Sequence, residues 1–434
     1  MSGRPFSHRI GTLAVPTLEG TITLRMTLHQ VSTRLLEPFQ ALRSRTFAQL
    51  YLAQTISLFG DAFTWVGLAL FAYQFGRQQA AIILSTALTL RVTAFILVSP
   101  FAGVLADRLD RKKILYFTHF IRMGLVGCLP FVQTEGQIYG VVFLLNVFNA
   151  FFTPTYQSII PQIVDRAYYR EAIGLSTATF QLLGVLGPSL AGVLAVWLGV
   201  REIFLVDAAS FIVAGLLILT LPGQLPNQAS ALVAAPPSTW LDVPRGARLL
   251  VKQPSIRFAL AIELVAAVAG AQITVNTVGH VKEGLGLSNS YYGWAVGAFG
   301  IGATLAAFGS GYDRSPSRRR SLIGGALPLG VALLGANYVG YSGLLLLWLL
   351  AGLGQSLAEI PSETLIGEHI ESAWQGRVYG SHFAISHLWW ALAYPLAGFT
   401  GSQFPGQTFL YGGLLSLGLL VLALLVFRPK AALF

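Results

Sequence analysis

Charged side chains are scarce in this sequence: they make up 11% of the 434 residues, whereas 54% of the residues are hydrophobic. Soluble globular domains carry about 25% charged residues. The composition therefore excludes an ordinary soluble domain and indicates a chain that folds largely within a lipid bilayer.

Several chemical motifs are also missing. Cys128 is the only cysteine, which excludes an internal disulfide or a thiolate cluster. None of the five lysines follows a glycine, as a P-loop requires, and no histidine begins an H-E-x-x-H or H-x-x-x-x-D motif. These absences argue against an ATP-driven pump and against a membrane-embedded enzyme. We expect no cofactor.

The apolar residues are gathered in long runs instead, and a helix needs about 20 of them to cross the hydrocarbon layer. Such windows lie at 47–74, 81–106, 114–133, 138–158, 172–197, 202–221, 256–279, 290–311, 321–340, 343–366, 379–400 and 408–427. We therefore predict an all-α membrane protein with twelve transmembrane helices. Residues 1–45 lack the apolar core of a signal peptide and are expected to form a mobile tail, with Met1 or Met26 as the start.

The net charge of +10 has a topological explanation. If both termini lie on one side, the segments on that side hold 23 of the 28 Lys and Arg residues. The opposite loops hold only Arg77, Arg201 and Lys282. By the positive-inside rule both termini are cytoplasmic, as expected for a multi-pass protein of a bacterial inner membrane. The bilayer, and not nucleic acid, explains the basic excess.

The sequence contains an internal repeat. Gly103 and Asp107 recur as Gly309 and Asp313, 206 residues later, and "PSLAG" at 188–192 recurs as "PLAG" at the same spacing. Such a repeat predicts two homologous six-helix bundles. The predicted parts are a tail at 1–45, bundles at 46–222 and 256–428, a cytoplasmic linker at 223–255 and a short tail at 429–434.

The repeated charged loop, "GVLADRLDRKKIL" at 103–115, resembles the loop between helices two and three of the major facilitator superfamily, with Asp110 in place of the usual glycine. The resemblance implies the major facilitator fold and a secondary transporter that works by alternating access, driven by an ion gradient, with protons the leading candidate. The loop is either an ordinary positive-inside loop or a conformational latch. The latch residues would be Gly103, Asp107, Arg108, Arg111, Gly309, Asp313 and Arg314.

The stretch "GVLGPSLAG" at 184–192 resembles an element that is typical of exporters in this superfamily. Close helix packing is the alternative, since Gly and Pro are common in membrane helices. The matching residues are Gly184, Gly187, Pro188 and Gly192.

Ionisable residues within spans are costly and are therefore candidate sites. Asp61 and Arg91 form an ion pair across the bundle, or Asp61 carries the proton or contacts substrate. Asn146 and Asn149 are neutral ligands or hold helices together, and Glu263 has no partner that the sequence identifies. We further place Asp207 near the outer end in a structural role, and His119 and Arg122 at the inner mouth.

The densest polar cluster lies in the last third of the chain, at Glu359, Glu363, His382 and His387. Imidazole and carboxylate groups suit Ni²⁺ or Co²⁺. They equally suit proton relay or hydrogen bonding between helices. Several stretches, "SLFGDAFTWVGLAL" among them, resemble the third drug–proton antiporter family and its bacterial nickel-resistance permeases.

This resemblance implies a monomeric, proton-coupled exporter of nickel or cobalt. Export of an amphiphilic organic molecule, such as a macrolide, a siderophore or a lysophospholipid, is the alternative.

Overall fold

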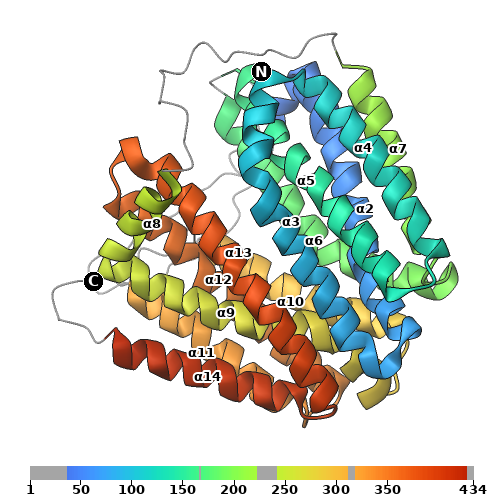
Figure 1. Ribbon diagram of the computed structural model, residues 1–434, viewed down its shortest axis with the longest axis vertical. Coiled ribbons are helices and arrows are strands. Elements are labelled where there is room, and N and C mark those ends of the chain that lie inside the picture. The colour runs from blue at the N-terminus through green and yellow to red at the C-terminus, as the bar shows by residue number, and fades with distance from the viewer. Residues whose placement is uncertain (1–36, 166–167, 222–241, 311–317, 428–434) are drawn as a thin grey trace, which may run out of the picture.

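The computed structural model describes residues 37–165, 168–221, 242–310 and 318–427, and within these ranges all regular secondary structure is helical. Six long helices form the first bundle: α2 (Arg45–Phe75), α3 (Ala80–Arg108), α4 (Arg111–Cys128), α5 (Glu135–Ile163), α6 (Tyr169–Trp197) and α7 (Ile203–Leu219). The second contains α9 (Pro254–Gly279), α10 (Asn289–Ser310), α11 (Arg318–Ala336), α12 (Tyr341–His369), α13 (Ser372–Gln403) and α14 (Thr408–Val426). Figure 1 shows the two bundles as separate groups.

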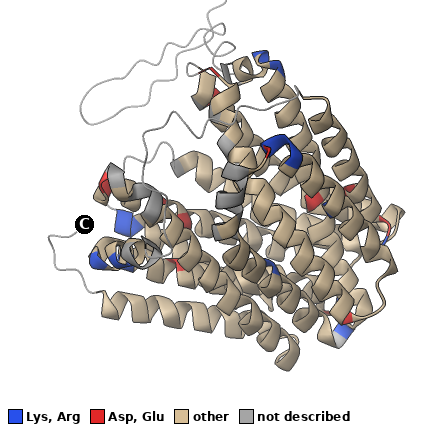
Figure 2. Ribbon diagram, turned by 45° about the horizontal axis from the view of Figure 1, so that its top comes forward, with Lys and Arg blue, Asp and Glu red and all other residues tan. Residues whose placement is uncertain are grey.

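Each of the twelve predicted spans overlaps one of these helices. Nine helices of the described chain are long and apolar enough to cross a membrane by length and composition. The other three are α7, which is apolar but has only 17 residues, and the more polar α11 and α13. Figure 2 shows few charged residues along the helices, and several of them lie at helix ends.

The predicted tail and the predicted linker each contain a short helix. Residues Glu37–Arg43 of the predicted tail form a short 3-10 helix, η1, in which Ala41 is buried. Within the predicted linker, α8 (Asp242–Lys252) is a helix with Leu250 fully buried and Arg248 exposed. Both helices have one cause, since an amphipathic segment gains helical stability only when its apolar face finds a surface to pack on.

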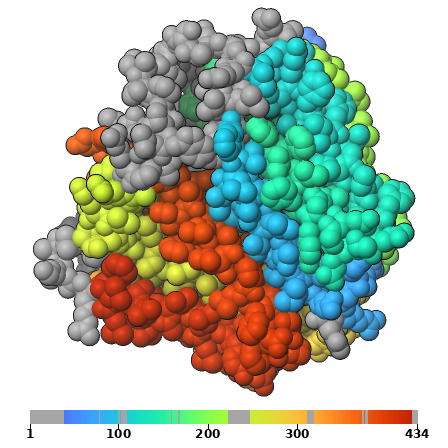
Figure 3. All heavy atoms as spheres, viewed as in Figure 1, coloured from blue at the N-terminus to red at the C-terminus, as the bar shows by residue number. Residues whose placement is uncertain are grey.

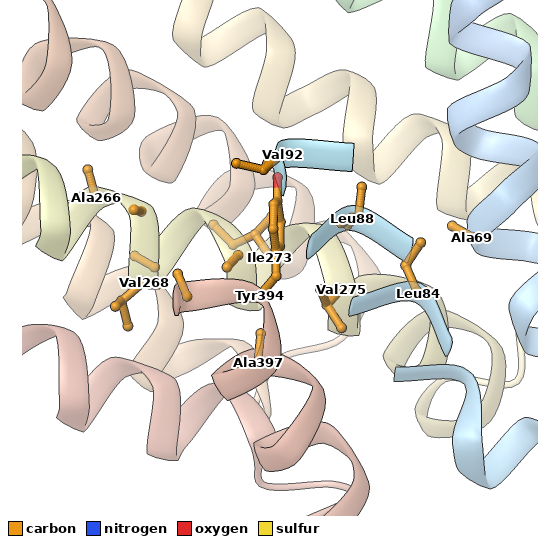
Figure 4. Packing of buried hydrophobic residues seen from close by; sticks show 14 of the residues in the cluster. Ala69, Leu84, Leu88, Val92, Ala266, Val268, Ile273, Val275, Tyr394 and Ala397 are labelled. Atoms are coloured by element: carbon orange, nitrogen blue, oxygen red, sulfur yellow. The ribbon is translucent and has the colours of Figure 1, made fainter. Parts of the chain in front are cut away.

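The two bundles share one apolar core where they meet. Leu84, Leu88 and Val92 of α3 lie beside Ile273 of α9 and Tyr394 of α13 (Figure 4). In the space-filling view, atoms of α3 meet those of α13 along a seam (Figure 3). The core is therefore continuous across the interface.

Glycines allow α6 and α10 to meet backbone to backbone. A Cβ atom built on Gly192 would lie 2.8 Å from the Cα atom of Gly293 and 3.0 Å from the Asn289 carbonyl oxygen. A Cβ atom on Gly293 would lie 2.6 Å from the Pro188 carbonyl oxygen. Only residues without side chains permit such an approach, as in other small-residue helix contacts within membranes.

The second contact between the bundles repeats the first. A Cβ atom on Gly398 of α13 would lie 2.0 Å from Ser85 Oγ and 3.1 Å from the Ala81 carbonyl oxygen, both on α3. Gly398 follows Gly192 by 206 residues, and Ser85 precedes Gly293 by 208. Equivalent positions of the two halves thus close the same end of the molecule, which is the pseudo-symmetry that the sequence repeat predicts.

Candidate functional site

A cavity of about 690 Å³ lies between the bundles. Helices α2 to α6 supply most of its wall, and α9 and α10 supply the rest, through residues such as Ile273, Tyr292 and Phe299. The lining reaches Tyr51 and Ile173, which lie near the helix ends opposite to the glycine contacts. The cavity therefore extends away from the closed end, in the direction in which the bundles diverge in Figure 1.

Most of the lining is apolar or aromatic, and its charged residues are Asp61, Arg91 and Arg122. Arg122 of α4 donates from one guanidinium nitrogen to both carboxylate oxygens of Asp61 on α2, at 2.8 and 3.0 Å. The Arg122 side chain is 1% exposed and lies 4.1 Å from the ring centroid of Phe211. This ion pair corrects two predictions: the partner of Asp61 is Arg122 and not Arg91, and Arg122 is a buried part of the cavity wall.

Asp207 of α7 lies directly behind this pair. It is fully buried and accepts hydrogen bonds from Thr64 Oγ1 and, at 3.0 Å, from Ser210 Oγ. A Cβ atom on Gly60 would lie 2.3 Å from the Asp207 carboxylate, so a glycine makes room for this acid. Asp61 is among the charged groups that act electrostatically on Asp207. The sequence predicted a structural role for Asp207 but did not indicate that this acid lies beside the ion pair of Asp61 and Arg122.

Arg91 of α3 has a different environment. Its guanidinium carbon lies 4.3 Å from the ring centroid of Trp65, a cation–π contact with α2. Within the described part of the chain, no carboxylate lies within ion-pair distance of Arg91. Arg91 therefore does not form the predicted pair with Asp61 and lies over the ring of Trp65 instead.

The two predicted asparagines separate in space. Asn146 is fully buried and donates to the Val142 carbonyl oxygen of its own helix at 2.8 Å. Asn149 lines the cavity, one turn further along α5. The structure therefore places Asn149, and not Asn146, where a transported molecule could reach it.

The acids and histidines of the second bundle are distributed over several partners. His382 Nε2 lies 2.7 Å from Glu263 Oε1, so the acid without a predicted partner has one. Glu359 accepts from Gln355 Nε2 at 2.6 Å, and His387 Nδ1 lies 2.9 Å from the Phe383 carbonyl oxygen. Glu363 is exposed.

No three His, Cys, Asp or Glu side chains in the described ranges come together as a set that could hold a metal ion. Glu359, Glu363, His382 and His387 are thus not assembled as one ligand set.

The exporter-like element lies mostly at the contact between the bundles. Pro188 and Gly192 meet α10 as described above, and a Cβ atom on Gly300 of α10 would lie 3.0 Å from the Gly184 carbonyl oxygen. Gly187 faces α2 instead, where its Cβ atom would lie 2.4 Å from that of Ala62. The element packs helices closely, and its link to export stays a prediction.

The charged loop between α3 and α4 has a local structural explanation for its unusual aspartate. Asp110 is the N-cap of α4, and its Oδ1 accepts from the backbone N–H of Lys112 at 2.9 Å. Lys112 Nζ donates to the Leu221 carbonyl oxygen at 2.6 Å, which ties the loop to the end of α7. Arg111 is buried at the start of α4.

The latch itself stays a prediction. Gly309 lies near the end of α10, in open space. The surroundings of Gly103, the side chains of Asp107 and Arg108, and the whole of Asp313 and Arg314 lie outside what the structure describes.

The model of the Major Facilitator Superfamily matches residues 50–271 and again residues 259–433. The chain belongs to this superfamily. The first match covers most of the first bundle and runs on into α9, and the second covers most of the second bundle. The superfamily makes the protein a transporter that spans the membrane several times.

Relatives of known sequence agree with this assignment. The chain is 26% identical over 421 residues to the MFS-type transporter y4rN of Sinorhizobium fredii, covering 93% of this chain and 98% of that one. It is 24% identical over 346 residues to the MFS-type transporter YfiS of Bacillus subtilis, with 76% and 80% covered. It is also 26% identical over 347 residues to the enterobactin exporter EntS of Shigella boydii, with 75% and 79% covered.

Solved structures of superfamily members share the fold. The nucleoside transporter NupG superposes with a TM-score of 0.71 at 16% identity, covering 89% of this chain and 100% of that one. A bacterial homologue of the lysosomal transporter Spinster, in an inward-facing and unoccupied conformation, gives a TM-score of 0.69 at 16% identity over 89% of this chain and 96% of that one. At these identities the likeness concerns the fold alone.

Proposed function

We propose that this protein is a proton-coupled exporter of an amphiphilic organic molecule. The observation that carries the proposal is the cavity of about 690 Å³ between the bundles, whose wall is mostly apolar and aromatic and holds three charged side chains among the described residues. Pockets of roughly 300–1,000 Å³ with a few placed polar groups are typical of sites for small organic molecules.

The chemistry of the wall favours an organic cargo over nickel or cobalt. A transition-metal ion requires several imidazole, thiolate or carboxylate ligands at one point. The cavity wall has one carboxylate, that of Asp61, which already accepts two hydrogen bonds from Arg122, and it has no histidine among its described residues. The similarity to EntS, named an enterobactin exporter, adds support for an organic cargo.

The ion pair of Asp61 and Arg122 offers a route for coupling. A proton bound to Asp61 removes the negative charge that holds the guanidinium, and release of that proton restores the pair. The energy of the buried pair therefore depends on proton occupancy, so a proton gradient can bias the two conformers. Asp207, hydrogen-bonded by Thr64 and Ser210, adds a second acid to the same cluster.

The conformation fits one step of this cycle. If the basic loops are cytoplasmic, the glycine contacts close the periplasmic end and the cavity extends toward the cytoplasm. This is the form in which an exporter takes up its cargo.

Inside-out vesicles that contain the protein test the proposal. We expect an imposed pH gradient to drive uptake of at least one member of a panel containing a macrolide, a catechol siderophore and a lysophospholipid, and not of Ni²⁺ or Co²⁺. Collapse of the gradient with a protonophore should abolish accumulation. Uptake of Ni²⁺ with no uptake of any organic compound would refute the proposal.

A further inference from the structure

We infer that Arg91 selects the cargo by binding an anionic group, so that the transported molecule is an anionic amphiphile. The inference rests on the proposed function and names its substrate class. It begins with the charges of the cavity, where Asp61 and Arg122 neutralise each other through a two-oxygen ion pair. Arg91 is left as a positive charge without a carboxylate partner among the described residues.

An unpaired arginine at this depth is costly. Arg91 lies eleven residues into the 29-residue helix α3, about 16 Å from its start at 1.5 Å per residue. Charged residues at such positions are rare and face protein or water-filled cavities, where they serve substrate or ion pathways. Arg91 faces the cavity, so a transported anion is a natural counter-charge.

The contact with Trp65 positions the Arg91 guanidinium to bind an anionic group. The guanidinium carbon lies over the indole ring, 4.3 Å from its centroid, and no hydrogen bond to a described residue occupies the N–H groups of Arg91. Those groups match the geometry of a carboxylate or a phosphate, which an arginine can bind through two parallel hydrogen bonds. An arginine that already contacts an aromatic ring also loses less side-chain freedom on binding than one without such a contact.

Within the described part of the chain, no acid is paired with Arg91. From α13 of the other bundle, the ionisable groups that act on it are His387 and Tyr394. Asp61, on α2, is engaged by Arg122. Asp207, behind that pair, is fully buried and hydrogen-bonded by Thr64 and Ser210. Among the described residues, an anion bound at Arg91 would therefore meet no carboxylate within ion-pair distance of this arginine.

The rest of the wall suits an apolar body attached to the anionic group. Phe152 and Phe180 line the cavity from the first bundle, and Ile273 and Phe299 line it from the second. A ligand with an anionic end at Arg91 and a ring system or chain against these residues would contact both bundles. Such a ligand bridges the two halves, as alternating access requires.

Three naphthalene amphiphiles that differ in a single group test the inference: a carboxylate, its neutral carboxamide and a trimethylammonium analogue. Binding to the purified full-length protein is measured by calorimetry at pH 7, and uptake is measured in inside-out vesicles against protein-free vesicles. We expect the carboxylate to bind best. Arg91→Gln should weaken its binding about ten- to a hundredfold, the usual worth of hydrogen bonds to a charged group, and leave carboxamide binding within about twofold.

Two further variants sharpen the result. Arg91→Lys should keep part of the preference, since it retains the charge but not the paired donors. Arg201→Gln is the matched control, because Arg201 also stacks on a ring, that of Phe71 at 5.0 Å, but lies on the surface outside the cavity. It should change neither binding nor uptake.

The outcomes separate the inference from the proposed function. If the parent protein binds and moves the carboxamide as well as the carboxylate, or if Arg91→Gln keeps the preference, Arg91 does not select charge, while organic export stands. If the trimethylammonium compound is preferred, the sign of the inference is wrong. If none of the three compounds binds or moves and Ni²⁺ does, the proposed function fails and the inference with it.

Discussion

Gly192 of α6 and Gly293 of α10 bring the two bundles into backbone contact, so closely that a Cβ atom on Gly192 would lie 2.8 Å from the Cα atom of Gly293. A larger side chain at either position must separate the helices. We expect Gly293→Leu to hold this end open and to reduce export at least tenfold. In a Cys128→Ser background, a cysteine placed at Ser85 should then react faster with a maleimide that does not cross membranes.

Gly174→Leu is the control for this experiment, because Gly174 lies on the same helix as Gly192 but has no neighbour within 4 Å of a built Cβ atom. Its labelling rate and transport should match those of the parent. Equal labelling of the Gly293→Leu variant and the parent would show that these contacts do not close the end.

The ion pair of Asp61 and Arg122 predicts a specific loss of coupling. We expect Asp61→Asn to abolish accumulation against a gradient, because the side chain can no longer exchange a proton, while downhill movement of the cargo survives. Accumulation and efflux in the same inside-out vesicles measure the two effects. Asp165→Asn, which changes an exposed acid, should retain both.

Unfolding is a competing explanation for such a loss, because Asp61→Asn leaves Arg122 buried without its counter-charge, at a cost of about 3–5 kcal/mol. The double variant Asp61→Asn with Arg122→Gln removes both charges. It should melt closer to the parent than the single variant does and still fail to accumulate cargo. Recovery of accumulation in the double variant would assign Asp61 a structural role only.

The contact of Glu263 with His382 predicts a stability effect within the second bundle. Both side chains are at most 10% exposed, and their atoms lie 2.7 Å apart. His382→Leu leaves the Glu263 carboxylate without this partner and should lower the stability by roughly 3–5 kcal/mol, read as a fall in the melting temperature in detergent. Glu263→Gln with His382→Leu should recover part of the loss.

An exposed pair provides the comparison for this experiment. Arg318 and Glu368 lie 2.9 Å apart, but their side chains are 31% and 44% exposed. Glu368→Gln should cost at most about 1 kcal/mol, since water screens the interaction. Similar losses for the two pairs would mean that burial of the Glu263 contact contributes nothing.

Metal dependence is predicted to be absent. Because the described histidines and acids do not form a ligand set, calorimetry should detect no stoichiometric binding of Ni²⁺, and EDTA should leave export of the organic cargo unchanged. His387→Ala should alter neither result. Tight Ni²⁺ binding that His387→Ala or Glu359→Gln weakens would restore the metal interpretation.

The sequence predicts the fold more completely than the site. The length of an apolar run is read from the run itself, and the 206-residue repeat is read by comparing the sequence with itself. These two signals predict the twelve helices, their two groups and the equivalence of Gly192 and Gly398. Pairing within the membrane depends on which helix faces are adjacent. Arg91 and Arg122 are both arginines within spans, and hydropathy does not distinguish which of them faces Asp61.

The same limit applies to the second bundle. Four acids and histidines close together in sequence indicated a common site, but helical rotation directs them to different neighbours, and the partner of His382 comes from α9, 119 residues away. Residue types indicate which side chains require a partner, and only the packing of the helices decides which partner each one finds.

The paired glycine contacts also determine how the closed end can open. Attraction between touching backbones is lost over very short distances, since a gap of about 0.5–1 Å already forfeits a quarter to a half of it. Two such contacts, at Gly192 and at Gly398, close the same end of the molecule, so both must break when that end opens. We therefore expect this end to be either closed or open. Single-molecule distance records should show abrupt jumps between two distances, with no populated intermediate.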